Sequence, residues 1–116
     1  MNVTIGDNRF KVKLCTTQKS ISEGMMGKNF NETFNGMLFM MPETTEQGFW
    51  MKDCIIPLDI IIINDRKINT IHHNCEPCED NCETYKGFGG EVLEVAGSTC
   101  KKLGIKKGDH VSFNLL

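Results

Sequence analysis

Residues 49–64 read FWMKDCIIPLDIIIIN and concentrate an aromatic pair, a lysine, two aspartates and a long apolar run. Pro57 divides the stretch, because proline cannot donate a hydrogen bond inside a central strand. Aromatic and β-branched residues favour strands, so the two halves predict strands over residues 48–53 and 58–64. The stretch therefore predicts a β-hairpin at the centre of the fold.

Strand alternation sorts the side chains of this predicted hairpin onto two faces. We expect Lys52 to lie opposite Asp59, since the neighbouring register would oppose two aspartates and like charges directly opposed are destabilising. Trp50, Ile61 and Ile63 share that face. A carboxylate on so apolar a face needs a partner.

Two interpretations of Asp59 stay open. In the first, Lys52 or nearby backbone amides satisfy the carboxylate and lock the hairpin. In the second, Lys52, Asp53 and Asp59 line a cleft beside Trp50, a polar group in an apolar pocket of the kind that small ligands use. Lys52 and Asp59 also permit acid–base chemistry, which would make the domain a small enzyme.

Short strands and turns fill most of the remaining chain. We expect strands over residues 2–5, 9–14, 36–41, 67–72, 91–95 and 110–115. The turn residues 6–8 join the first two strands in a predicted hairpin, and Pro42 is expected to end the third. Thr17 caps a helix over residues 18–26, and a second helix fits residues 98–103. The glycine-rich residues 87–90 predict a flexible rim. Together these elements predict one mainly β domain over residues 1–116, a small barrel or two-layer sheet of about eight short strands with two short helices.

Composition narrows the possible partners. With 13 basic and 15 acidic residues the net charge is -2, which predicts no nucleic-acid partner because phosphate binding relies on positive charge. The longest apolar run, residues 54–63, is about half the length that a bilayer requires, so no transmembrane segment is predicted. We expect a soluble protein. The first residues lack the pattern of a signal peptide, which leaves a cytoplasmic protein or an exported domain whose leader has been removed.

A second concentration of chemistry lies in residues 72–82, which read HHNCEPCEDNC. Thiolates and imidazoles at this spacing can assemble a tetrahedral zinc site. The candidate ligands are His72, His73, Cys75, Cys78 and Cys82. A disulfide explains the spacing as well, and free thiols are the third alternative. Apart from zinc, no cofactor is predicted.

Four segments in order carry a family resemblance. They are GMMGK at residues 24–28, GMLFMMPE at 36–43, FWMKDCIIPLDIIIIN at 49–64 and LGIKKGDHVSF at 103–113. Over residues 10–113 the chain resembles the domain of unknown function 192 family. The resemblance implies a compact, mainly β domain that bacteria often export behind a leader and that archaea and phage also contain. It implies no established activity.

The resemblance also separates the candidate residues of the central stretch. Trp50, Lys52 and Asp59 fit the family pattern F-W-M-K-N-T with a following P-L-D. Asp53 and Cys54 stand where that pattern has Asn and Thr, so interest concentrates on the first three residues.

In residues 72–82 the resemblance points to one cysteine pair. Pro77, Cys78, Cys82 and Tyr85 are similar to a P-C…C…Y pattern of the family, in which Cys75 is not typical. This implies a local disulfide between Cys78 and Cys82, beside the free-thiol and zinc alternatives.

Three functional hypotheses follow. The leading one is a noncatalytic binding or accessory module whose ligand, a small molecule or a protein, contacts Trp50, Lys52, Asp53 and Asp59. The second is a small enzyme that uses Lys52 and Asp59 as acid and base. The third is a metal or thiol-redox module centred on residues 72–82.

Overall fold

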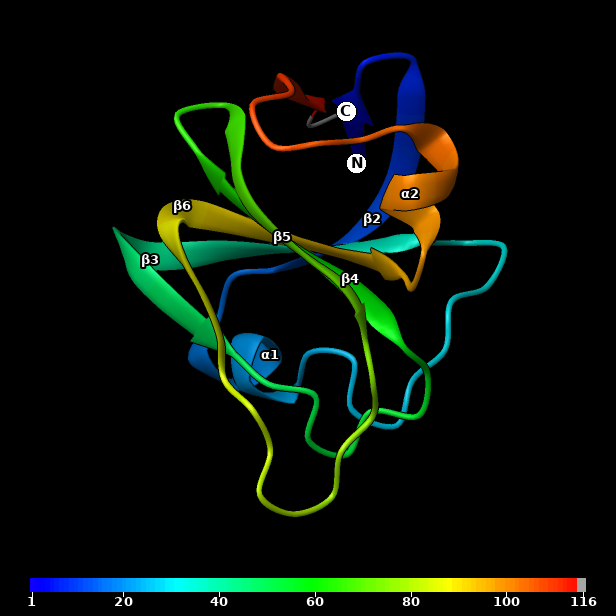
Figure 1. The fold of residues 1–116 in the computed structure, drawn as a ribbon, viewed down its shortest axis with the longest axis vertical. Helices are drawn as coiled ribbons and strands as arrows, with labels where there is room; N and C mark the ends of the chain where they lie inside the picture. Colours follow the sequence, from blue (N-terminus) through cyan, green and yellow to red (C-terminus); the bar gives the residue numbers. More distant parts are fainter. Residues whose placement is uncertain (115–116) are drawn as a thin grey trace.

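A seven-stranded sheet organises the computed structural model, which describes residues 1–114 (Figure 1). The strands are β1 (Asn2–Ile5), β2 (Asn8–Cys15), β3 (Gly36–Phe49), β4 (Leu58–Asn64), β5 (Lys67–Cys75), β6 (Tyr85–Ala96) and β7 (Val111–Asn114). They lie in the order β5-β4-β6-β3-β2-β1-β7. The mainly β fold with two short helices is confirmed. The final position of the predicted strand 110–115 lies outside the described residues.

The sheet curls into a half-barrel. β1 and β2 form the predicted antiparallel hairpin, and β2 then pairs with β3 in parallel. The outermost strands approach each other, since Lys67 forms a bridge with His110 and the Ile68 N–H donates to the Asp109 carbonyl at 3.0 Å. Figure 1 shows both chain ends at one end of the molecule.

The predicted hairpin between residues 48–53 and 58–64 is wrong. β3 ends at Phe49 and pairs with β6, while β4 lies between β5 and β6. Every side chain from Leu58 to Ile63 is 0% exposed. A strand that is buried on both faces takes a central place with a partner on each edge, which the local hairpin register overlooked.

β3 is also longer than predicted. The run 36–41 was expected to end at Pro42, but the strand continues through the proline to Phe49. An irregular register between Met40 and Thr45 accommodates the break, and bulges are where a sheet tolerates proline.

Residues 87–90 lie within β6 and are no flexible rim. A Cβ atom on Gly87 would lie 2.6 Å from Cδ1 of Ile62, and one on Gly89 would collide with the Ile63 carbonyl oxygen. Glycine is required here because the β4 backbone passes so close to β6.

Each face of the sheet carries its own apolar cluster. One face holds Ile61, Ile63, Leu93 and Val95 and packs against Cys100 of α2 (Thr99–Leu103). The other face carries what we call the α1-side cluster, which comprises Cys15, Met25, Met37, Phe39, Met51, Leu58, Ile60, Ile62, Cys75 and Val92. Ile21 of α1 (Gln18–Glu23) packs against that cluster.

Both helices begin where predicted within one residue. Thr17 caps α1 in a capping box with Ser20, and the helix ends at Gly24, whose φ of 46° breaks the helical path before the expected residue 26. α2 runs between Ser98 and Gly104. In the part of the chain that the structure describes, no helix has the length and apolarity needed to cross a bilayer.

Candidate functional site

A pocket of about 230 Å³ opens between α1, β3, β6 and the segment that follows β3. We call it the α1 pocket. Its walls are mainly apolar, and its lining residues include Ile21, Met25, Met26, Phe39, Met41, Phe49, Trp50, Lys52, Cys54 and Glu94. Trp50 is 50% exposed, although it is a large aromatic side chain. Apolar walls with a few polar groups are typical of small-ligand sites.

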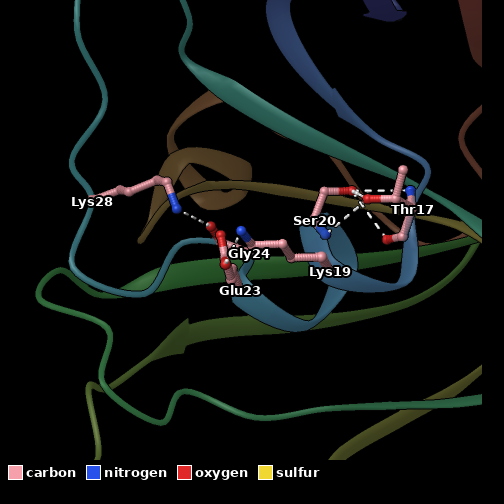
Figure 2. A network of polar contacts seen from close by, with 6 residues as sticks. All are labelled: Thr17, Lys19, Ser20, Glu23, Gly24 and Lys28. Atoms are coloured by element: carbon pink, nitrogen blue, oxygen red, sulfur yellow. Dashed lines mark hydrogen bonds and ion pairs between the residues drawn. The ribbon is translucent and has the colours of Figure 1, made fainter.

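Helix α1 forms one wall of the pocket and is fixed at both ends. The Ser20 N–H donates to Oγ1 of Thr17 at 3.0 Å, as Figure 2 shows. Beyond the other end, Nζ of Lys28 donates to the Gly24 carbonyl at 3.1 Å. Lys19 pairs with Glu23 at 3.9 Å across the exposed side of the helix. The cap and the lysine therefore hold the wall in place from both sides.

The segment after β3 supplies the rim of the pocket. Met51 is 1% exposed and anchors the segment in the α1-side cluster. The Asp53 N–H donates to the Cys78 carbonyl at 2.9 Å, and the Cys78 N–H donates to the Met51 carbonyl at 3.1 Å. Nζ of Lys52 donates to the Glu79 carbonyl at 2.9 Å. The rim is thus fastened to the loop between β5 and β6.

Asp59 lies on the other face of the sheet. It shares its face of β4 with Ile61 and Ile63, as predicted, but that face is turned away from the α1 pocket. The expected common face with Trp50 and Lys52 is wrong, because the segment carrying them does not pair with β4.

The Asp59 carboxylate is 0% exposed and is satisfied by backbone amides. Its Oδ1 accepts from the N–H groups of Asn74 at 2.7 Å and Ser98 at 3.0 Å, and its Oδ2 accepts from Cys100 at 2.8 Å. No ion pair joins it to Lys52 within residues 1–114. Asp59 therefore ties β4 to the end of β5 and the start of α2.

Asp53 is exposed and lies outside the lining of the pocket. Its φ is 59°, and its carbonyl accepts from the Gly27 N–H at 2.9 Å. Its backbone, more than its carboxylate, is what shapes the rim.

Glu94 is the site residue that sequence reasoning did not single out. It lies in β6 between Met37 of β3 and Ile60 of β4, and it is 3% exposed. Burial raises the pKa of its carboxyl from 4.5 to about 8. Within residues 1–114 no group donates a hydrogen bond to this carboxyl, and its oxygens reach the surface of the pocket instead of being sealed in the core. The signal was present in alternation, which puts Glu94 on the same face as buried Val92 in an otherwise apolar strand.

The five candidate metal ligands do not converge. Cys78 and Cys82 form a disulfide, with their Cα atoms 5.7 Å apart. Nε2 of His72 lies 2.7 Å from the Lys86 carbonyl. Cys75 is 3% exposed, and burial raises its pKa to about 12. His73 is exposed. In the described part of the chain, no three His, Cys, Asp or Glu side chains group closely enough to hold a metal ion.

A family model named DUF192, described as "Uncharacterized ACR", matches residues 1–113. The chain belongs to the domain of unknown function 192 family. A search among curated proteins found no match.

Two crystal structures show the same fold. A protein of unknown function from Novosphingobium aromaticivorans DSM 12444 is 32% identical with a TM-score of 0.83, covering 97% of this chain and 82% of that one. A protein described as a "putative transcription regulator" from Sinorhizobium meliloti 1021 is 29% identical with a TM-score of 0.83, covering 96% of this chain and 89% of that one. This member of the domain of unknown function 192 family therefore shares its half-barrel with both of these proteins.

Proposed function

We propose that this member of the domain of unknown function 192 family is a noncatalytic binding module and that the α1 pocket holds its ligand. The observation that carries the proposal is the Glu94 carboxyl, which lines an apolar pocket without a hydrogen-bond partner in the described chain. Burying a polar group without a partner costs stability. A ligand that donates a hydrogen bond to Glu94 would offset this loss of stability.

The candidate residues contribute unequally to this proposal. Trp50 and Lys52 line the pocket and are placed to contact a ligand at its rim. Asp53 shapes the rim through its backbone. Asp59 does not contact the pocket. It stabilises the fold by accepting backbone hydrogen bonds on the other face of the sheet. Acid–base chemistry by Lys52 and Asp59 together has no geometric support, because only Lys52 lines the pocket.

Nucleic acid is not the partner that we propose. The description of the Sinorhizobium meliloti protein as a transcription regulator is a statement about that protein. For this chain the net charge of -2 still predicts weak attraction to a phosphate backbone. Anisotropy of labelled duplex DNA at low salt checks this expectation.

The single tryptophan of the chain makes the proposal testable by fluorescence. Tryptophan emission comes from Trp50 alone, at the rim of the pocket. We expect a saturable change in emission when the protein is titrated with small apolar probes that carry one polar end, namely n-hexylamine, n-hexanol and hexanoate.

Two variants of α1 locate the binding. Ser22 is exposed and lines the pocket, so Ser22→Phe fills the opening without disturbing the core. Gln18 is exposed on the same helix outside the lining, so Gln18→Phe is the matched control. Binding should be lost in the first variant and kept in the second. Equal binding by both variants would place the site elsewhere and refute the proposal.

A further inference from the structure

Glu94 faces several titratable groups, and none of them neutralises it. The nearby thiols are Cys15 on β2, Cys54 on the rim and Cys75 on β5. Burial raises the pKa of all three, to about 11 for Cys54 and about 12 for Cys75, so they are uncharged at neutral pH. The neutral thiols therefore neither pair with a Glu94 carboxylate nor repel one.

The charged groups around the pocket are engaged elsewhere. Nζ of Lys28 bonds to the Gly24 carbonyl, and Nζ of Lys52 bonds to the Glu79 carbonyl. Glu23, which lines the pocket from α1, pairs with Lys19. The chain thus places two lysines beside the pocket and uses neither to balance the carboxyl at its base.

We propose that the α1 pocket recognises a protonated amine attached to an apolar body, with the ammonium group bound by the Glu94 carboxylate. This inference rests on the proposed binding function and names its ligand class. The geometry that supports it is a carboxyl on a 3% exposed residue that lines a pocket with mainly apolar walls and receives no hydrogen bond from residues 1–114. An ammonium ion is all donor, and a carboxylate is all acceptor, so each satisfies the other.

The walls suit the remainder of such a ligand. Phe39 and Phe49 pack edge to face with ring centroids 5.0 Å apart, and Trp50 adds a third ring at the rim. Aromatic faces attract cations, most strongly where water is excluded. The methionines of the lining offer adaptable apolar contacts to an alkyl chain.

Binding should release a proton from the protein. At pH 7 the Glu94 carboxyl is mainly protonated, because burial raises its pKa to about 8. An adjacent ammonium group favours the carboxylate form. The alkylammonium arrives with its charge, the Glu94 carboxylic acid loses its proton to the buffer, and the ion pair remains in the pocket.

The test compares the three hexyl probes on wild-type protein by Trp50 fluorescence and by calorimetry. They share one alkyl chain and differ only in the polar end. We expect hexylammonium to bind roughly tenfold or more tightly than n-hexanol, the ratio that about 1.4 kcal/mol provides. Hexanoate should bind most weakly. The heat of hexylammonium binding at pH 7 should depend on the ionisation enthalpy of the buffer, which reports the released proton.

Glu94→Gln is the decisive variant, and Glu91→Gln is its matched control on the same strand. Glu91 is only half-buried and does not line the α1 pocket. Glu94→Gln should lose the preference for hexylammonium over n-hexanol and the buffer dependence, while its n-hexanol affinity changes little. Glu91→Gln should keep both properties of the wild type.

The possible failures are distinguishable. If n-hexanol or hexanoate binds as tightly as hexylammonium and Ser22→Phe abolishes that binding, the amine class is refuted and the binding function stands. Hexylammonium binding that is unchanged in Glu94→Gln, or that releases no proton, also refutes the inference. If no probe binds the wild type, both the inference and the proposed function fail.

Discussion

At the scale of single residues, two acids on opposite faces of the sheet differ in their hydrogen bonding. The Asp59 carboxylate receives three backbone N–H groups, whereas the Glu94 carboxyl receives none within residues 1–114. A carboxyl that is removed from water and has no donors is driven toward its neutral form, as burial does to Glu94. The first arrangement serves the fold, and the second costs stability.

The cost of Glu94 gives stability a defined pH dependence. Burial raises the pKa of the Glu94 carboxyl to about 8 in the folded chain, from an ordinary value of 4.5. Between these values the folded state binds more protons than the unfolded state, so stability falls as pH rises. The free energy of unfolding should begin to fall near pH 4.5 because of this carboxyl. The slope approaches about 1.4 kcal/mol per pH unit, and the fall ends above pH 8. Glu94→Gln removes it.

Urea unfolding of wild type and Glu94→Gln at pH 5, 6, 7 and 8 measures this effect. The free energy of unfolding of the variant should rise relative to that of the wild type at each step. Glu91→Gln should show a smaller rise, since its carboxyl is half-buried and its pKa is raised less. A difference between wild type and Glu94→Gln that is flat in pH would contradict the assignment.

Asp59→Asn should be strongly destabilising. An asparagine keeps one acceptor oxygen but turns an NH₂ group toward a backbone N–H, which leaves buried donors unpaired. We expect a loss of about 3 kcal/mol or more in the free energy of unfolding. Lys52→Ala should lose less than about 1 kcal/mol, because it gives up a single bond to the exposed Glu79 carbonyl.

Denaturant unfolding of these two variants separates a structural aspartate from a rim lysine. Similar losses in both would indicate an energetic link between Lys52 and Asp59 that the geometry does not contain. A double variant whose loss equals the sum of the two single losses would confirm their independence.

At the scale of elements, β6 is the strand on which the site depends. It carries Glu94 into the α1-side cluster and pairs with both β3 and β4. Its glycines let the β4 backbone approach where a side chain would not fit. The strand therefore combines a tightly packed half with a half that carries the unpaired acid.

Gly89→Ala should disrupt this strand. The added methyl group would collide with the Ile63 carbonyl oxygen, which is backbone and cannot turn aside. Overpacking of this kind costs on the order of 3 kcal/mol. Phe88→Ala is the control, since Phe88 is 47% exposed on the same strand and should change stability little. Thermal unfolding compares the two, and equal melting temperatures would refute the close approach.

Local patterns predicted the elements that local chemistry determines. The turn residues at 6–8 predicted the first hairpin, and Thr17 predicted the start of α1. Residues 87–90 were misassigned because the reason for those glycines is a strand that lies far away in sequence. The partners of β4 were missed for the same reason, since a short stretch of sequence does not indicate which distant strands will pair with it.

The candidate site was predicted in part. Trp50 and Lys52 line the pocket, but Asp59 does not, because its place was inferred from a hairpin that does not form. Glu94 was visible as an acid in an apolar strand. Only the tertiary fold shows that nothing in the described chain satisfies it.

At the scale of the whole molecule, one continuous sheet separates two environments. Among residues 1–114, the face that holds Ile61 and Ile63 is closed by β1, β7 and α2, and its buried Asp59 carboxylate is satisfied by backbone N–H groups. The face that holds the α1-side cluster is covered by a short helix and loops, which leave the pocket open. If the α1 pocket binds a ligand as we propose, recognition and the Asp59 tie belong to different sides of the same strands.

The pairing of β1 with β7 puts Asn2 directly beside Asn114. Figure 1 shows these chain ends at one extremity of the molecule and α1 toward the other. A fused domain, a resin or a sensor chip attached at the N-terminus would emerge at that extremity. An N-terminal tether would therefore leave the α1 side of the molecule facing away from the support, where a probe can reach it.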